Sequence, residues 1–200
     1  MVLIRIFGLL TLALAMSVQA DDISVNPAWD CLGFTVVELA HKPELIEAVR
    51  TYNLSPPDVH ALDLVWDSFS AQDADLRKVL LHPVTPLIQQ AIEHISMQGE
   101  GFLMGANGGL VAATDKTTDF WQGDESQFSD AVLLPDGQWH IEGDIADDSS
   151  HSMLIKISSP VYDPKTHKSI GVLMLGFDQF VVDFEETCSK PTPVVNSSNP

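Results

Sequence analysis

The residue types best suited to binding chemistry gather in one short segment, from position 115 to position 125. Its candidate ligand-binding residues are Asp115, Thr117, Asp119, Phe120, Trp121 and Asp124. Carboxylates can accept hydrogen bonds from a ligand or face an amine, and an indole ring can stack on a ligand or cover it. The segment therefore predicts one wall of a small-molecule pocket. The alternative is that the two aromatic rings anchor the loop on the core while Asp124 caps the next helix.

Two residues from the N-terminal half complete the candidate ligand-binding set. Trp66 follows Leu62 and Val65 in an apolar stripe at helical spacing, so a place in the hydrophobic core is its alternative role. Arg77 is one of only two arginines after position 20, and a bidentate guanidinium is the usual partner of a carboxylate ligand. Exposure to solvent is the alternative for Arg77, because charged side chains are seldom buried.

The sequence offers no motif for catalysis, and we expect no catalytic residue, no metal centre and no cofactor. It lacks the Gly-x-Ser-x-Gly turn of esterases, the His-Glu-x-x-His helix of zinc proteases and the phosphate-binding P-loop. Asp144, Asp147 and Asp148 could hold a cation, but their spacing is not that of an EF-hand, so a solvated loop is the better interpretation. The acidic field of this region favours a cationic or neutral ligand over an anion.

A hairpin and the strands after it must position the candidate segment. Two apolar runs flank Ala-Asn-Gly-Gly at 106–109, and Asn-Gly is the strongest short signal for a turn between two strands. The strands are expected at 101–106, 109–115, 137–143, 151–160 and 168–178. The last of them is apolar at nearly every position, which is typical of a central strand covered on both faces.

The first half of the chain is predicted to be helical. Apolar residues recur at three- and four-residue steps from position 28 to position 53, and Pro43 either kinks or restarts this run. Further helices are expected at 58–69, 74–81 and 84–97.

Three stretches of the sequence together resemble the Cache (PDC, PAS-like) family of extracytoplasmic sensor domains, in its single-Cache, stand-alone form. They are the hairpin with its polar segment at 101–125, the Pro-Val-Tyr-Asp stretch at 157–164 and the Ile-Gly-Val stretch at 169–178. The resemblance covers residues 30–185. It implies an α+β fold, with a PAS-like five-stranded antiparallel sheet, a long N-terminal helix and further helices packed on the sheet. It also implies a ligand held directly after the second strand.

The sequence departs from the pattern of this family at two positions. Gly105 stands where such sequences often have Asp, and Phe120 stands where Tyr is common. One polar group is therefore missing at the end of each hairpin strand.

The N-terminus predicts export. Arg5, the apolar stretch 6–18 and the small residues around Gln19 are typical of a signal peptide that is cleaved after Ala20. The apolar stretch is shorter than the ~20 residues that a spanning helix needs, so we expect no direct membrane insertion after signal removal. The expected organisation is a signal peptide at 1–20, one periplasmic sensor-like domain at 21–187 and a disordered tail at 188–200.

Charge and cysteine content limit the partners and the compartment. The formal net charge of −18 argues against nucleic acid and against anionic membrane surfaces as partners. Cys31 and Cys188 are the only cysteines, and in an oxidising compartment such a pair usually forms a disulfide. Two free, buried thiols are the alternative.

These observations predict a free-standing sensor or binding protein rather than an enzyme. Its ligand would be a small organic molecule, and the classes left open are amino acids, amines and short carboxylates. It would pass its ligand state to a separate membrane partner, either a receptor or a transporter. Two alternatives remain: a protein–protein interaction module with a vestigial pocket, and a periplasmic hydrolase that uses the carboxylates after the hairpin.

Overall fold

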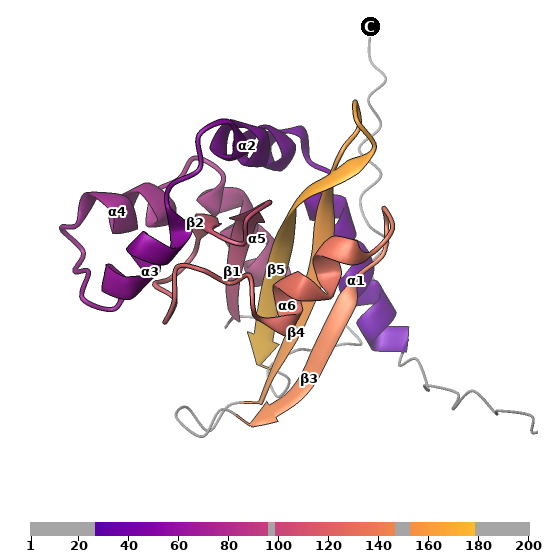
Figure 1. Ribbon diagram of the computed structural model, residues 1–200. Coiled ribbons are helices and arrows are strands. Elements are labelled where there is room, and N and C mark those ends of the chain that lie inside the picture. Colours follow the sequence, from indigo (N-terminus) through magenta and orange to yellow (C-terminus); the bar gives the residue numbers. More distant parts are fainter. Residues whose placement is uncertain (1–26, 96–98, 147–152, 179–200) are drawn as a thin grey trace, which may run out of the picture.

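The computed structural model describes residues 27–95, 99–146 and 153–178 (Figure 1). In this part of the chain five helices come first: α1 (Pro27–Ala40), α2 (Pro43–Leu54), α3 (Val59–Trp66), α4 (Ala74–Leu80) and α5 (Thr85–Ile95). The elements that follow are β1 (Gly99–Gly105), β2 (Leu110–Ala113), α6 (Ser126–Ser129), the 3-10 helix η1 (Ala131–Leu133), β3 (His140–Ala146), β4 (Met153–Asp163) and β5 (Lys168–Asp178). The strands form one antiparallel sheet in the order β2-β1-β5-β4-β3. The predicted α+β fold with five antiparallel strands is confirmed, and β5 is the central strand, as predicted.

Some of the predictions concern residues outside the described ranges. These are the signal peptide at 1–20, the tail at 188–200, Cys188, and the loop with Asp147 and Asp148; the side chain of Asp144 is not described either. Export, the disulfide between Cys31 and Cys188 and a cation at this loop therefore stay predictions.

The helical run predicted at 28–53 is two helices, because Pro43 restarts it. Lys42 has extended backbone angles (φ −65°, ψ 132°), and Pro43 occupies the first turn of α2. A residue before proline is driven towards extended angles, and proline fits the first helical turn, where its missing N–H has no partner to lose. The restart, rather than the kink, is what the structure shows.

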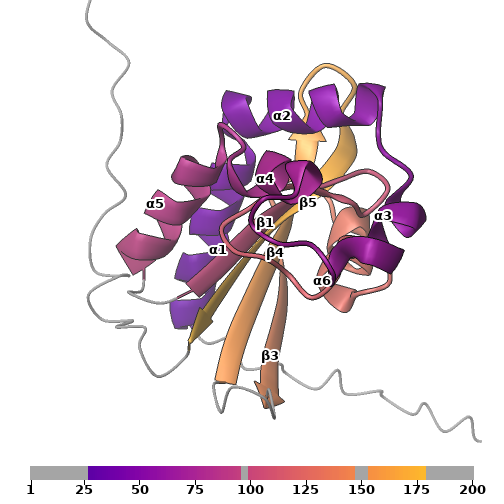
Figure 2. The same cartoon turned by 90° about the vertical axis from the view of Figure 1, so that its left-hand side faces the viewer.

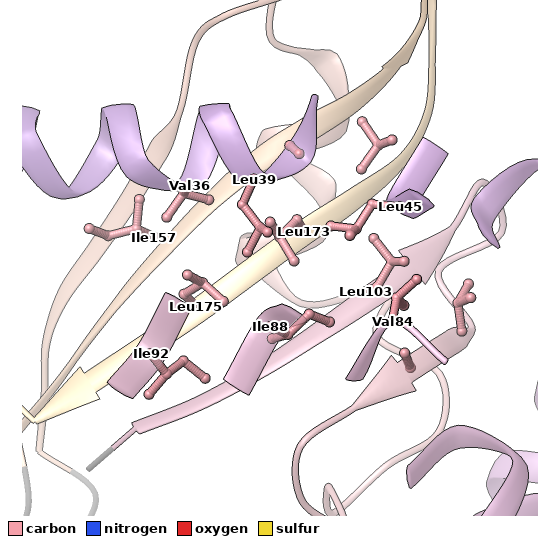
Figure 3. Close-up of a cluster of buried hydrophobic side chains, with 14 of the residues drawn as sticks. Val36, Leu39, Leu45, Val84, Ile88, Ile92, Leu103, Ile157, Leu173 and Leu175 are labelled. Carbon is pink, nitrogen blue, oxygen red and sulfur yellow. The ribbon is translucent and has the colours of Figure 1, made fainter. Parts of the chain in front are cut away.

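Helices cover the sheet on both faces. Side chains alternate between the two faces along a strand, so Leu103 and Leu173 join a core cluster with α1, α2 and α5 (Figure 3). Their neighbours Met104 and Met174 join a second cluster with α3, α4 and α6. Figure 2 shows α1 and α5 on one side of the sheet and α3 and α6 on the other. We call the second side the α6 face.

An ion pair ties α2 to the turn between β4 and β5. The guanidinium of Arg50 donates from Nε to Oδ2 of Asp163 at 3.3 Å and from a terminal nitrogen to Oδ1. The backbone N–H of Lys165 donates to the same carboxylate at 2.7 Å. These donors stabilise the charged form of Asp163 and lower its pKa to about 2. The Arg50 guanidinium has the larger effect, and the Lys165 amide has the next largest.

We expect this ion pair to make stability depend on pH at the acid end. Asp163 stays charged in the folded protein to a pH near 2, whereas aspartates of the unfolded chain take up protons near pH 3.8. The stabilisation is therefore complete above that value and is lost as the pH falls towards 2. Asp163→Asn should lower the melting temperature at pH 7, and the difference from the wild type should shrink between pH 4 and pH 2.

The control for this experiment is Glu47→Gln. Glu47 is exposed and lies 3.5 Å from the Arg50 guanidinium, so its loss should change the melting temperature little. A difference between wild type and Asp163→Asn that stays constant down to pH 2 would contradict the assignment.

Candidate functional site

The turn of the β1–β2 hairpin is a three-residue turn in which Gly108 supplies the left-handed conformation. Gly108 has φ +79°, whereas Asn107 is not in the positive-φ region. The N–H of Gly108 donates to the carbonyl of Gly105 at 3.0 Å, and the N–H of Gly105 donates to the carbonyl of Gly109 at 2.9 Å. The predicted hairpin is confirmed, but its turn is not the two-residue type that needs positive φ at both central positions.

The polar segment after β2 turns back and pairs with the start of that edge strand. The N–H of Leu110 donates to the carbonyl of Phe120 at 3.3 Å, and the N–H of Gln122 donates to the carbonyl of Gly108 at 2.8 Å. Gly109 and Trp121 form an isolated antiparallel bridge. The segment therefore covers the outer edge of β2, and it is not a free loop.

One side chain of α3 and one of the segment hold the two together, and the sequence singled out neither of them. One carboxylate oxygen of Asp63 accepts from two consecutive N–H groups, those of Phe120 at 2.8 Å and Trp121 at 2.9 Å. The ammonium of Lys116 donates to the carbonyls of Asp67 and Phe69, at the end of α3, at 2.8 and 2.9 Å. We call α3 and residues 115–123 the α3–loop unit, because these bonds join them.

Trp66 and Phe120 lie in the hydrophobic core. Trp66 is completely buried and Phe120 is 2% exposed, with their ring centroids 5.1 Å apart. The indole N–H of Trp66 donates to the carbonyl of Thr117 at 3.0 Å, so it stabilises the loop from below. These positions match the alternatives to ligand binding: Trp66 is a core residue, and Phe120 anchors the loop on the core.

Trp121 is half-buried against the hairpin turn. Its indole N–H donates to the carbonyl of Asn107 at 2.8 Å, and its ring meets the edge of His60 at a centroid distance of 4.5 Å. A Cβ added at Gly123 would lie 2.5 Å from the indole nitrogen, so the ring depends on glycine at that position. The polar edge of Trp121 is therefore occupied by the protein itself.

The remaining candidate residues do not meet in one hollow. Thr117 is half-buried and its hydroxyl donates to the carbonyl of Asp119 at 2.6 Å. The exposed members of the set are Asp115, Asp119, Asp124 and Arg77. Asp124 was expected to cap the next helix, α6, if it did not bind a ligand. The N-cap residue of α6 is instead Glu125, and its side chain makes no capping bond. A ligand-binding role for these residues stays a prediction.

The two departures from the family pattern have physical reasons. A Cβ added at Gly105 would lie 2.3 Å from ring carbons of Tyr52 and 3.0 Å from Oδ1 of Asn53. Asn53 accepts there from the N–H of Ala106 at 3.0 Å, so α2 occupies the space that an aspartate would need. At the other position, Phe120 lies in an apolar cluster.

Two buried glutamines connect the segment to α6. The amide of Gln122 donates to the carbonyl of Asp119 at 2.9 Å, and the amide of Gln127 donates to the oxygen of Gln122 at 2.9 Å. A backbone carbonyl can only accept, so it fixes the orientation of the Gln122 amide, which in turn fixes that of Gln127. The oxygen Oε1 of Gln127 is left as an obligate acceptor.

We group this acceptor with polar residues at the end of α6 and on the strands that α6 contacts, and we call Gln127, Asp130, His140 and Ser158 the α6 cluster. Ile141 and Ile157 pack into the cluster of α1 and α5, so their strand neighbours His140 and Ser158 face the opposite way, towards α6. These two residues are direct partners in the β3–β4 pairing. The nitrogen Nε2 of His140 lies 3.9 Å from a carboxylate oxygen of Asp130, the residue that ends α6.

Three buried atoms of the α6 cluster have no hydrogen-bond partner within residues 27–95, 99–146 and 153–178. They are Oε1 of Gln127, Nε2 of His140 and Oγ of Ser158. Ser158 is completely buried and Gln127 is 3% exposed. Sequence analysis missed this group, because Ser158 has no base near it in the sequence and only the strand register brings His140 opposite.

Comparison with known proteins finds similarity at the level of structure alone. The sequence matches no protein-family model, and no curated protein matches it. Similar solved structures are the sensor domain of the histidine kinase DctB from Vibrio cholerae (12% identity, 82% of this chain and 53% of that chain, TM-score 0.46), the sensor domain of DcuS from Escherichia coli (12%, 82% and 100%, TM-score 0.41) and the ligand-binding domain of the chemoreceptor Tlp3 from Campylobacter jejuni in complex with L-valine (13%, 83% and 66%, TM-score 0.39).

All three similar structures are sensor or ligand-binding domains, the kind of domain that the sequence motifs predicted. The chain spans about half of the DctB sensor domain. Among the described residues, no helix has the length and apolar character to cross a membrane.

We expect Asp63 to be the residue on which the position of the segment depends. Asp63→Ala leaves the N–H groups of Phe120 and Trp121 without their acceptor, and it should lower the free energy of unfolding by about 1–3 kcal/mol. Urea unfolding measures this loss, and hydrogen exchange should quicken at these two amides.

Asp63→Asn is the matched control, because its amide oxygen can occupy the same place without the charge. It should lose less stability than the alanine variant and retain more protection of the two amides. Equal losses in the two variants would show that the acceptor oxygen is not what holds the segment.

Proposed function

We propose that this chain is a free-standing, Cache-like periplasmic sensor domain that binds a small organic molecule on the α6 face of its sheet. The observation that supports the proposal is the α6 cluster, in which Gln127, His140 and Ser158 each leave a buried polar atom without a partner among the described residues. A buried polar group without a hydrogen bond costs about 1–3 kcal/mol, and such groups are few in native proteins. A ligand that bonds to them would recover this free energy.

The chemistry of the cluster favours a ligand that donates hydrogen bonds. Oε1 of Gln127 can only accept, and Asp130 supplies a carboxylate at the C-terminal end of α6. The hydroxyl of Ser158 can donate or accept. An amine or the ammonium group of an amino acid fits this set better than a carboxylate does.

The bonds around the cluster offer a route for the signal. A ligand bound to Gln127 would act through Gln122 on the carbonyl of Asp119, and this carbonyl belongs to the segment that Asp63 fixes to α3. A ligand shifts the equilibrium between two arrangements of the α3–loop unit only if it binds one arrangement more tightly than the other. A separate membrane receptor or transporter that contacts this unit would read the change.

Export and the disulfide belong to the same proposal. The protein purified from the periplasm should begin at Asp21, and its intact mass should be lower by two hydrogens than that of the reduced protein, because Cys31 and Cys188 are joined. Mass spectrometry before and after reduction measures both. A mass that includes residues 1–20, or two thiols that alkylate without reduction, would contradict this part.

Neighbouring serines on β4 give a sharp test of the ligand site. Ser158→Ala removes a hydroxyl that makes no hydrogen bond to the described residues, so the free protein should be no less stable. The same variant should weaken the binding of a ligand found by thermal-shift screening about tenfold or more, equivalent to about 1.4 kcal/mol. The screen should compare amines, amino acids, short carboxylates and purines, and calorimetry should measure the affinities.

Ser159→Ala is the control. Its hydroxyl is also buried, but it donates to the carbonyl of Gln138 at 3.1 Å. This variant should therefore lose about 1 kcal/mol of stability and bind the ligand as the wild type does. If Ser158→Ala binds as the wild type does, or if no compound of these classes shifts the melting temperature, the proposed site is wrong.

A further inference from the structure

A cavity of about 260 Å³ lies at the β2 edge of the sheet, away from the α6 cluster. Its walls come from α2 and the residues after it, from α4 and His82, from β2, from Leu62 on α3 and from Phe120. Of the eight candidate ligand-binding residues from the sequence, only Phe120 lines it. We call it the edge cavity.

The interior and the rim of the edge cavity differ in character. The buried lining residues are Val79, Leu110, Val111 and Phe120, all of them apolar. The exposed lining residues, Thr51, Ser55, Asp75 and Lys78, are all polar. A guest would therefore place an apolar part inside and a polar head at the rim.

His82 adds a hydrogen-bond donor of fixed position to this lining. Its Nδ1 accepts from the backbone N–H of Val84 at 3.3 Å. A nitrogen that accepts cannot carry a hydrogen, so in the neutral ring the hydrogen is on Nε2, and this atom is a donor. Burial lowers the pKa of His82, so the ring is held in this neutral, donating form.

The charges of the lining decide which head fits. Lys78, in the last turn of α4, is the cation among the lining residues and has three N–H donors. Tyr52 is already engaged, since its hydroxyl donates to Asn107 at 3.1 Å, and burial raises its pKa to about 12. Asp75 also lines the rim, three residues before Lys78, so an anionic head must lie on the side of Lys78 and His82.

We propose that the edge cavity is a second small-molecule site that takes a monocarboxylate with a short aliphatic tail. The carboxylate accepts from the ammonium of Lys78 and from Nε2–H of His82, and the tail lies against Val79, Leu110 and Phe120. An apolar cavity of ~150 Å³ holds benzene, which has six non-hydrogen atoms, so a cavity of about 260 Å³ has room for a guest of roughly eight to ten. Hexanoate has this size.

Three probes of one shape test the proposal on the exported, disulfide-bonded protein. Hexanoate, hexanamide and hexylamine share the tail and differ in the head, and acetate has the carboxylate without the tail. Calorimetry should show hexanoate binding more tightly than each of the others. In nitrogen-15 spectra, the His82 ring should show its hydrogen on Nε2, and this signal should shift when hexanoate is added.

Three variants test whether hexanoate binding depends on residues that line the edge cavity. Lys78→Gln should weaken hexanoate binding about tenfold or more, whereas Lys42→Gln, which changes the net charge equally on an exposed residue outside the cavity, should leave it unchanged. Ala48→Met fills part of the cavity with a flexible side chain and should also weaken binding. Circular dichroism and the melting temperature show whether each variant is folded.

Several outcomes would overturn the proposal. Hexylamine binding as tightly as hexanoate, equal affinities in Lys78→Gln and Lys42→Gln, or no hexanoate binding would each do so. The Ser158→Ala variant should bind hexanoate as the wild type does, since Ser158 lines the α6 cluster and not the edge cavity. A failure of the α6 site and a failure of the edge cavity therefore give different results.

Discussion

One carboxylate, that of Asp63, fixes the segment on which both sites depend. The residues between β2 and α6 have almost no regular structure, so their buried N–H groups need acceptors from elsewhere. Asp63 supplies one oxygen to two consecutive N–H groups, and the next residue in the segment, Gln122, bonds to the hairpin turn. This order fixes Phe120 inside the core, Trp121 over the turn and Gln122 towards α6.

The two sites have opposite hydrogen-bonding character and share one structural unit. The α6 cluster offers mainly acceptors, Oε1 of Gln127 and the carboxylate of Asp130, whereas the edge cavity offers donors from Lys78 and His82. Both adjoin the α3–loop unit: Gln127 reaches it through a hydrogen bond, and the edge cavity reaches it through Phe120. The two proposals require one chain of negative net charge to accept guests of opposite type, which is physically allowed because screening limits the field of distant charges to a Debye length of about 8 Å.

The sequence predicts what depends on local pattern and misses what depends on strand register. The strand at 168–178 was placed correctly, because its apolar run is long and continuous. The strand before it continues beyond the predicted end at Pro160. Its pairing with β3 ends at Ser158, so Pro160 has β5 on one side only, and its missing N–H breaks no ladder. Asp63 lies 57 positions from Phe120, and no local signal could reveal that contact.

Ser158 and Ser159 differ in whether their hydroxyls have a hydrogen-bond partner among the described residues. They are consecutive, chemically identical and equally buried, and they face opposite sides of the sheet. Ser159 has a carbonyl partner, as a structural hydroxyl should, whereas Ser158 has none within the described residues. An alanine at position 158 would avoid the cost of burying that hydroxyl. A serine without a bond to the described residues, opposite His140 in the β3–β4 pairing, is the feature on which the proposed ligand site rests.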